Sequence, residues 1–362
     1  MRIKTSGAWL IFGALLFLSF NARADLEFHP GAVWRDVTGQ PIQAHGGGIL
    51  LYHKVYYWYG EDRTPGIRSA VACYSSTNLY DWKREGVAMW QTNLPRYYGS
   101  PMFVERPKVI FNPRTKKFVM WMHAEQGGYH YASAGIATSD TPAGPFVFLK
   151  TIRPITNDFE FPADDPNAQK QFGATFRDMN LFMDDNGRAY VFYAGEDNWT
   201  MYVVRLNNDF TGPYTPAVQN KTWARILVRA HREAPAPFKA DGRYFLITSA
   251  CTGWAPNAAD CAVAKSVLGP YQSLGNPCVG TNADTTFGTQ STFVLPAPGP
   301  KGKFIFMADE WRPRNLSDSR YIWLPLVQKG DGSFTLQWRD RWDLSVFNGL
   351  PPLRFGQFER PE

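Results

Sequence analysis

The sequence predicts an all-β protein built as a five-bladed β-propeller, and two patterns carry this prediction. Helical periodicity is almost absent after the first 24 residues, whereas short runs of aromatic and β-branched residues recur between Gly, Pro, Asn and Asp turns. A hairpin unit also repeats five times, roughly every 50–70 residues, which is typical of propeller blades. With 44% hydrophobic and 15% aromatic residues, the 362-residue chain is too apolar to be disordered.

Each repeat consists of an apolar strand, a turn and an aromatic strand. The five strand pairs are expected at residues 48–51 with 56–59, 108–111 with 118–121, 180–183 with 190–193, 236–239 with 244–247, and 292–295 with 304–307. The turns carry hairpin residues, as in the segment Asp184 to Gly187. A third strand and an outer strand follow most hairpins, and Gly-Pro-aromatic turns recur at residues 144–146, 212–214 and 269–271. A two-domain β-sandwich, the alternative fold, would not repeat the same hairpin and turn in register.

The first 24 residues have the order of a secretory signal peptide. Arg2 and Lys4 come first, an apolar run from Ala8 to Phe20 follows, and small residues flank Arg23. The apolar run is too short to span a bilayer comfortably. We therefore expect a secreted or periplasmic protein without membrane attachment once the signal is removed, with residues 25–362 forming a single domain and the protein existing as a monomer.

Charge and cysteine content exclude some function classes. Removal of Arg2, Lys4 and Arg23 with the signal peptide lowers the formal net charge from +6 to +3, which does not indicate nucleic-acid binding. Export permits disulfides among the four cysteines, and the favoured pair is Cys251 with Cys261, which flank a nine-residue loop. The cysteine spacing indicates no zinc site.

Polar residues stand where the innermost strand of each blade begins, so we expect them to converge at one end of the central channel. These residues are Gln43, His45, Glu105, Asp178, Glu233 and Gln290. Carboxylates that are close together and partly desolvated raise at least one pKa, which keeps a proton available near neutral pH. A glycosidase acid needs that property. Alternatively, the neighbouring arginines 106, 177 and 232 could form structural ion pairs with these carboxylates.

Long motifs across nearly all of residues 25–362 resemble glycoside hydrolase family 43, and within it the exo-β-1,3-galactanase branch. The motifs are Gln43-Ala44-His45-Gly46-Gly47-Gly48-Ile49-Leu50, Tyr57-Trp58-Tyr59-Gly60-Glu61-Asp62, Glu105-Arg106-Pro107-Lys108-Val109, Gly253-Trp254-Ala255-Pro256-Asn257, Trp311-Arg312-Pro313 and Ser319-Arg320-Tyr321-Ile322-Trp323. The resemblance implies a five-bladed propeller and an inverting mechanism. It also implies a polysaccharide or oligosaccharide as the partner.

Within this resemblance Glu233 matches the general acid, because the family's acid precedes a hairpin in a Glu-small-Pro motif. Most of the family places the catalytic base, an Asp, at the start of blade one, where this chain has Ala44 to Gly48 and no carboxylate. The galactanase branch shares that omission, and there Gln290 matches a Gln that can occupy the base position. An amide is a weak base, so Gln290 would act as its imidic acid tautomer, orient water, or only bind a sugar hydroxyl.

Further positions match sugar-contacting residues of the branch. Glu105 matches a third acidic residue that contacts substrate or tunes the acid, and the other matches are Glu61, Tyr129, Asp178 and Asn198. Trp254 suits stacking against the apolar face of a sugar. Trp58 and Trp121 are expected to be packing residues instead. No cofactor is expected, no metal ligand set is identified, and a structural calcium is possible without being indicated by the spacing.

The function that this resemblance implies is exo-acting, inverting hydrolysis that releases galactose from the non-reducing end of β-1,3-galactan. The arabinogalactan backbone is such a polymer. One alternative is an α-L-arabinofuranosidase or β-D-galactofuranosidase on the same fold. A second is a carbohydrate-binding propeller without catalysis, which the missing Asp in blade one motivates.

Overall fold

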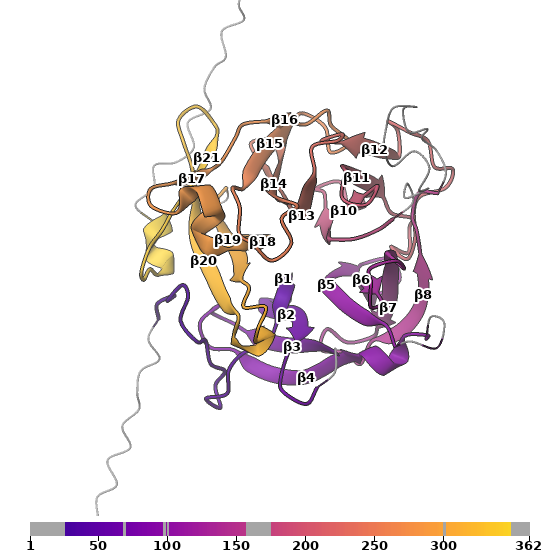
Figure 1. Cartoon of the computed structure of the whole chain (residues 1–362), viewed down its shortest axis with the longest axis horizontal. Helices are drawn as coiled ribbons and strands as arrows, with labels where there is room; N and C mark the ends of the chain where they lie inside the picture. Colours follow the sequence, from indigo (N-terminus) through magenta and orange to yellow (C-terminus); the bar gives the residue numbers. More distant parts are fainter. Residues whose placement is uncertain are drawn as a thin grey trace, which may run out of the picture.

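The computed structural model describes residues 26–67, 70–96, 99, 101–156, 175–299 and 302–348. Five sheets stand around a central axis in sequence order, so the predicted five-bladed β-propeller is confirmed (Figure 1). The expected signal peptide, residues 1–24, lies outside the described residues and stays a prediction. Among the described residues, no helix has the length and apolar character needed to cross a membrane.

The blades follow one another along the chain. Blade one contains β1 (His45–Tyr52), β2 (Val55–Asp62), β3 (Ala70–Ser76) and β4 (Lys83–Trp90); blade two contains β5 (Phe103–Asn112), β6 (Lys117–Glu125), β7 (Ser133–Ser139) and β8 (Val147–Ile152); blade three contains β9 (Met179–Met183), β10 (Ala189–Gly195), β11 (Thr200–Arg205) and β12 (Trp223–Ile226); blade four contains β13 (Arg232–Ala240), β14 (Arg243–Ala250), β15 (Asp260–Ala264) and β16 (Gln272–Ser273); blade five contains β17 (Cys278–Val279), β18 (Gln290–Pro296), β19 (Phe304–Glu310), β20 (Arg320–Gln328) and β21 (Phe334–Gln337). Short 3-10 helices are η1 (Gln91–Asn93), η2 (Ala283–Gly288), η3 (Leu316–Asp318) and η4 (Leu344–Phe347).

The first strands of the repeats, β1, β5, β9, β13 and β18, form the inner ring. Each of them contacts the next, and β18 contacts β1, so the ring closes around the axis. The five predicted hairpins are confirmed, because β1–β2, β5–β6, β9–β10, β13–β14 and β18–β19 are antiparallel pairs within the expected ranges. The start of every innermost strand therefore faces the same end of the channel.

Five hydrophobic clusters make up the core, one at each junction between neighbouring blades. Each sheet consequently buries both faces, which explains why its strands are continuously apolar rather than alternating. Trp58 packs at the junction of blades five and one, and Trp121 at the junction of blades two and three. Both indoles are almost completely buried, so their predicted packing role is confirmed.

The two ends of the described chain join blade five to blade one. Phe28 pairs with Trp342 through two backbone hydrogen bonds, and their rings lie 4.4 Å apart. The Trp342 indole donates to the Trp323 carbonyl oxygen at 2.8 Å. The amide of Gly31 also donates to the carbonyl of Tyr321 on β20. These contacts connect the segment before β1 with the last blade.

The expected disulfide between Cys251 and Cys261 is wrong, because all four cysteines are free. Cys261 on β15 pairs in register with Ile247 on β14, four residues before Cys251. At about 3.3 Å per residue, this places the two cysteines roughly 13 Å apart along the strand. A disulfide allows less than about 7 Å between Cα atoms.

Candidate active site

Four of the five innermost strands, β1, β5, β13 and β18, begin with β-bulges that direct polar side chains toward the channel. The register shifts lie between His45 and Gly48, Glu105 and Lys108, Glu233 and Ala236, and Ser291 and Phe293. The residue after Glu105 and the residue after Glu233 both have a left-handed backbone, at φ +52° in Arg106 and in Ala234. Such bulges bend a strand and re-aim its side chains. The local kink therefore turns the carboxylates of blades two and four into one cavity.

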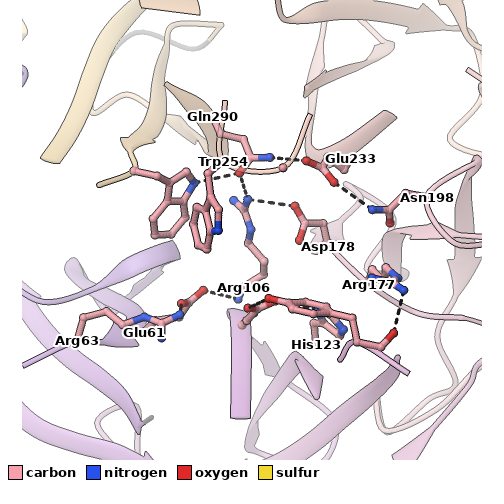
Figure 2. Close-up of a pocket in the computed structure, with 14 residues that line it drawn as sticks. Glu61, Arg63, Arg106, His123, Arg177, Asp178, Asn198, Glu233, Trp254 and Gln290 are labelled. Carbon is pink, nitrogen blue, oxygen red and sulfur yellow. Dashed lines mark hydrogen bonds and ion pairs between the residues drawn. The ribbon is translucent and has the colours of Figure 1, made fainter. Parts of the chain in front are cut away.

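A cavity of about 280 Å³ at this end of the channel is lined by all eight residues that were predicted to act in catalysis or substrate binding, and Figure 2 shows it. Those residues are Glu61, Glu105, Tyr129, Asp178, Asn198, Glu233, Trp254 and Gln290. The sequence reasoning did not assign six further lining residues to the site, namely Arg63, Arg106, His123, Arg177, Gly253 and Trp311. His123 is a polar residue near the end of a strand that is otherwise apolar and buried. This sequence pattern could have identified it as a candidate site residue.

Glu233 lies between two amides and close to a second carboxylate. Its Oε1 accepts a hydrogen bond from Gln290 Nε2 at 2.9 Å, and its Oε2 accepts one from Asn198 Nδ2 at 3.1 Å (Figure 2). Burial, followed by the negative charge of Asp178, raises the pKa of Glu233 to about 8. This carboxyl group therefore holds its proton at neutral pH, as a general acid must.

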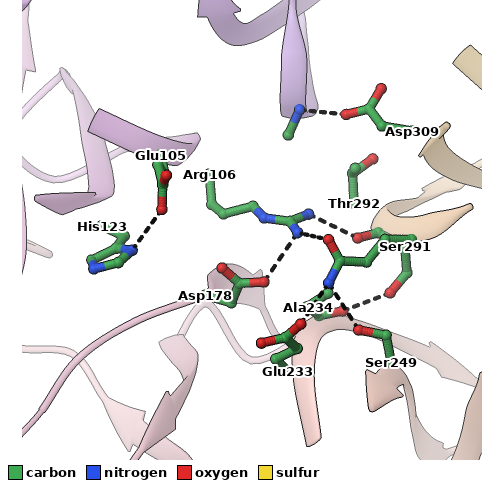
Figure 3. A network of polar contacts seen from close by, with 12 residues as sticks. Glu105, Arg106, His123, Asp178, Glu233, Ala234, Ser249, Ser291, Thr292 and Asp309 are labelled. Atoms are coloured by element: carbon green, nitrogen blue, oxygen red, sulfur yellow. Dashed lines mark hydrogen bonds and ion pairs between the residues drawn. The ribbon is translucent and has the colours of Figure 1, made fainter. Parts of the chain in front are cut away.

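Gln290 is fixed by four polar partners, which Figure 3 shows in part. Its amide oxygen accepts hydrogen bonds from Arg106 and, at 3.0 Å, from Trp311 Nε1. Its amide nitrogen donates to Glu233 and, at 3.0 Å, to Ser249 Oγ. Two donors on the oxygen and two acceptors around the nitrogen match the ordinary amide tautomer. Gln290 thus contacts the acid directly.

Arg106 is a buried guanidinium that connects three blades. It forms an ion pair with Asp178 at 3.0 Å and donates to the carbonyl of Ser291 at 3.0 Å (Figure 3). Its backbone amide donates to Glu61 Oε1 at 3.1 Å. Burial raises the pKa of Glu61, although the adjacent cation of Arg63 opposes that shift. Arg106 therefore pairs with the acid of the next blade rather than with its sequence neighbour Glu105.

Glu105 belongs to a separate charged group with His123. The imidazole Nδ1 of His123 lies 3.2 Å from Glu105, its Nε2 lies 3.1 Å from Glu125, and the Tyr129 hydroxyl donates to Glu105 at 2.7 Å. Burial opposes ionisation of Glu105, but its contacts with His123 and Tyr129 lower its pKa below the usual value. Burial likewise disfavours the charged form of His123, but its contacts with Glu105 and Glu125 raise its pKa to about 9. Glu105 is therefore ionised, and the carboxylate that raises the pKa of Glu233 is Asp178.

One set of side chains in the cavity has the spacing of a metal site. Ligand atoms of Glu105, His123 and Asp178 all lie within 4.8 Å of one another. However, His123 bridges two carboxylates and holds a proton, and Asp178 is already paired with Arg106. A metal requires a neutral imidazole. This group does not fit a cation, and the expectation that no cofactor is required stays a prediction.

Aromatic side chains form one wall of the cavity. Trp254 is 48% exposed, and its ring meets that of Trp311 edge-on at 5.7 Å. The guanidinium of Arg106 lies over the Trp311 ring at 5.6 Å. Trp254 thus offers a free indole surface at the mouth, whereas Trp311 is engaged by the polar network.

Two buried basic side chains lie beneath the cavity. The side chain of Arg106 lines this cavity, and Lys108 lines a second, mainly apolar cavity toward the opposite end. Both residues are buried, and Lys108 Nζ donates to the carbonyl of Gly46 at 2.7 Å. These two side chains therefore lie between the two cavities and form the floor of the candidate active site.

Gln43 and His45 do not line the cavity, contrary to expectation. Gln43 donates to the carbonyl of Ser317, and His45 is buried against Tyr321 with Nδ1 3.6 Å from Asp309. These contacts direct both side chains toward blade five instead.

Comparison with known proteins agrees with this geometry. The sequence profile of the glycosyl hydrolases family 43 matches residues 44–292, more than half of the chain. The chain belongs to glycosyl hydrolase family 43. Among solved family 43 structures, a β-1,3-galactosidase with galactodeoxynojirimycin is 41% identical, covers 87% of this chain and 100% of its own, and has a TM-score of 0.78.

Two further relatives differ in their sequence identity to this family 43 chain. A Phanerochaete chrysosporium exo-β-1,3-galactanase variant with β-1,3-galactotriose is 32% identical, with 91% of this chain and 70% of its own covered and a TM-score of 0.75. The β-D-galactofuranosidase xynD of Aspergillus niger is 23% identical over 222 residues, and the match spans 58% of each chain.

Proposed function

We propose that this family 43 hydrolase releases galactose from the non-reducing end of β-1,3-galactan with inversion of configuration. The observation that carries the proposal is the placement of Glu233 beside two amides and Asp178, in a cavity with Arg106 and Lys108 at its floor. A cavity with a floor suits one terminal sugar rather than the middle of a chain. The 41% identical family 43 β-1,3-galactosidase supports galactose as that sugar.

In this reaction Glu233 protonates the glycosidic oxygen as the bond to the leaving chain breaks. Water attacks the anomeric carbon from the opposite face, and it loses a proton to solvent or to a base as the new carbon–oxygen bond forms. In most inverting enzymes two carboxyl groups about 6.5–9.5 Å apart leave room for that water. Glu233 and Gln290 are in contact in this structure, so Gln290 reaches water only if substrate binding separates the pair.

The polar network around Gln290 supports an orienting role over an imidic acid base. An imidic acid would carry a proton on the oxygen that Arg106 and Trp311 already approach as donors. We therefore assign to Gln290 the positioning of Glu233, and the placement of water or a sugar hydroxyl once bound substrate has separated the pair. Replacing Gln290 with Ala should lower the rate severely, and near-normal activity would remove it from the mechanism.

The remaining cavity residues suit a neutral sugar. Glu61, Glu105 and Asp178 offer carboxylate acceptors for hydroxyl groups, and their charges are matched by Arg63, His123 and Arg106 respectively. Trp254 and Tyr129 offer apolar rings against which a sugar face can stack. A polysaccharide substrate also agrees with the proposed export of the enzyme.

The test is to incubate the purified protein with β-1,3-galactan and, separately, with arabinofuranosyl and galactofuranosyl substrates, following products by proton NMR. Initial release of α-galactose from galactan alone is the expected result. Galactofuranose release would favour the activity named for the Aspergillus niger relative, and arabinose release the other furanoside alternative. Binding without release of any sugar would favour a propeller that has lost catalysis.

A further inference from the structure

Glu125 is a fully buried carboxylate next to the candidate active site, but it does not line the cavity. It is the last residue of β6, and the connection that follows it toward β7 carries Tyr129. A charged side chain is almost never fully buried without partners, so a carboxylate at this place requires an explanation. The reaction described above gives it no role.

Four donors surround this carboxylate, and three of them belong to the connection between β6 and β7. Oε1 accepts hydrogen bonds from the amides of Gln126 at 2.9 Å and Tyr131 at 2.8 Å, and Oε2 accepts one from the amide of Ala132 at 2.9 Å. His123 Nε2 lies 3.1 Å from Oε2. An ionised carboxylate has about four acceptor sites, so all of them are used here.

These hydrogen bonds fold residues 126–132 into a turn against the end of β6. Within the turn the amide of Tyr129 donates to the carbonyl of Gln126 at 3.1 Å. The backbone is left-handed at two places, with φ +56° at Tyr129 and +40° at Ala132. That conformation is unfavourable for residues other than glycine. The turn therefore depends on contacts that hold it, and Glu125 supplies three of them.

The turn places Tyr129 in the cavity. The Tyr129 hydroxyl donates to Glu105 Oε1 at 2.7 Å, and its ring meets that of Phe103 edge-on at 5.6 Å. The guanidinium of Arg177 lies over the same ring at 5.6 Å and donates to the Tyr129 carbonyl at 2.9 Å. Tyr129 is nonetheless 38% exposed. Its position consequently depends on the backbone turn that carries it as well as on these neighbours.

We propose that Glu125 is a positioning residue for substrate binding, which acts by holding the turn that carries Tyr129. The proposal rests on the proposed function, in which Tyr129 lies against the bound sugar. Glu125→Gln nearly preserves the shape of the side chain, but an amide has one acceptor oxygen and an NH₂ group that only donates. In either orientation this NH₂ group faces at least one backbone N–H of the turn, so two donors oppose each other and the turn loosens.

The first measurement compares KM and kcat of the wild type and Glu125→Gln for β-1,3-galactotriose. KM should rise about tenfold while kcat changes less than about twofold, because a contact with the sugar is lost in ground state and transition state alike. In a Tyr129→Ala background the same substitution should change KM less than about twofold, since the side chain that it positions is absent. An equal rise of KM in both backgrounds would overturn the proposal, because the effect would then not pass through Tyr129.

Two further variants control for the substitution itself. Asp36→Asn exchanges a carboxylate that accepts from the amides of Thr38 and Gln40, in a turn that lines no part of the cavity, and KM should stay at the wild-type value. Glu125→Asp keeps the charge beside His123 but shortens the side chain. KM should therefore rise in this variant too, and it replaces Glu125→Gln if the latter does not fold. A wild-type KM in Glu125→Asp would contradict the proposal.

A readout without substrate separates this proposal from the proposed function. Hydrogen exchange, followed by mass spectrometry on a peptide that covers residues 126–132, should be several-fold faster in Glu125→Gln, whereas peptides from β5 should keep their protection. This result supports the role of Glu125 in the turn even if the protein hydrolyses no galactan. Unchanged exchange of residues 126–132, in an enzyme that does release galactose, refutes the role of Glu125 alone.

Discussion

At the scale of single residues, Glu233 illustrates how its surroundings can make one carboxyl group retain a proton near neutral pH. Burial removes the water that would stabilise its charge, and Asp178 adds repulsion. The amides of Gln290 and Asn198 meanwhile donate to the two carboxyl oxygens, which fixes the orientation of the carboxyl group. Glu105, like Glu233, has an arginine as its direct neighbour in the sequence, yet its contacts with the imidazole of His123 and the hydroxyl of Tyr129 keep it ionised. Identical chemistry at equivalent strand positions thus yields opposite protonation states.

Glu233→Gln should lower kcat by about 10²–10⁴-fold with little loss of galactan binding, because an amide of nearly the same shape cannot deliver the proton. Initial-rate kinetics and isothermal calorimetry with β-1,3-galactotriose measure the two effects. Glu310→Gln, on the rim beside Arg312, serves as the matched control and should retain the wild-type rate. Retention of full activity in Glu233→Gln would show that the acid is elsewhere.

The pH profile follows from the raised pKa of Glu233. Glu233 can donate a proton only when it is protonated, so kcat/KM should stay constant up to about pH 8 and fall tenfold per pH unit above that value. Asp178→Asn removes the repelling charge, which lowers the pKa of Glu233 and moves this limb to lower pH. Stopped assays in overlapping buffers measure both profiles, and an Asp178→Asn limb at unchanged pH would contradict the electrostatic explanation.

At the scale of elements, the run Gly46-Gly47-Gly48 at the start of β1 permits three close approaches. A Cβ on Gly47 would lie 2.2 Å from the Tyr59 carbonyl oxygen, and one on Gly48 would lie 2.5 Å from Lys108 Cδ. On Gly46 it would lie 2.6 Å from Glu61 Oε1. Only a strand without side chains therefore lets blade one pack so tightly beneath the cavity.

Gly47→Ala should destabilise the fold by about 3 kcal/mol, since the obstructing atoms belong to the backbone and cannot rotate away. Gly330→Ala is the control, because a Cβ there meets nothing within 4 Å and the backbone has no positive φ. Urea unfolding gives both free energies. Equal stability of the two variants would show that β1 can shift without cost.

The strands of the blades could be predicted from the sequence because turn residues and aromatic runs are local signals. The bulges after Glu105 and Glu233 could not, since a register shift is defined only by the partner strand. Likewise the contact between Gln290 and Glu233 joins blades five and four, and the Arg106–Asp178 pair joins blades two and three. The wrong cysteine pairing has the same origin, because loop length does not reveal the register of β14 and β15.

At the scale of the whole molecule, stability depends on closing the ring between blades five and one. Trp342 pairs with Phe28 and donates to the carbonyl of Trp323, which ties the two ends of the described chain together. The inner ring could be anticipated from the repeated hairpins, and the family from the long sequence motifs. This closure could not, because its residues lie outside the repeats.

Trp342→Ala should cost about 3–5 kcal/mol, as expected when a buried indole is truncated. Trp338→Ala, four residues earlier and 37% exposed, should cost far less. Differential scanning calorimetry compares the two. A similar melting temperature for both variants would show that the ring holds without this contact.

The floor formed by Arg106 and Lys108 also dictates the order in which products depart. A terminal sugar that enters through the single mouth is followed by the rest of its polymer, so after cleavage the shortened chain must leave before the freed monosaccharide. Each catalytic event then ends with complete dissociation from the polymer. Early in the digestion of a galactan of uniform length, every chain should accordingly be shortened slightly, whereas an enzyme that stayed on its polymer would degrade a few chains completely. Size-exclusion chromatography distinguishes these two length distributions.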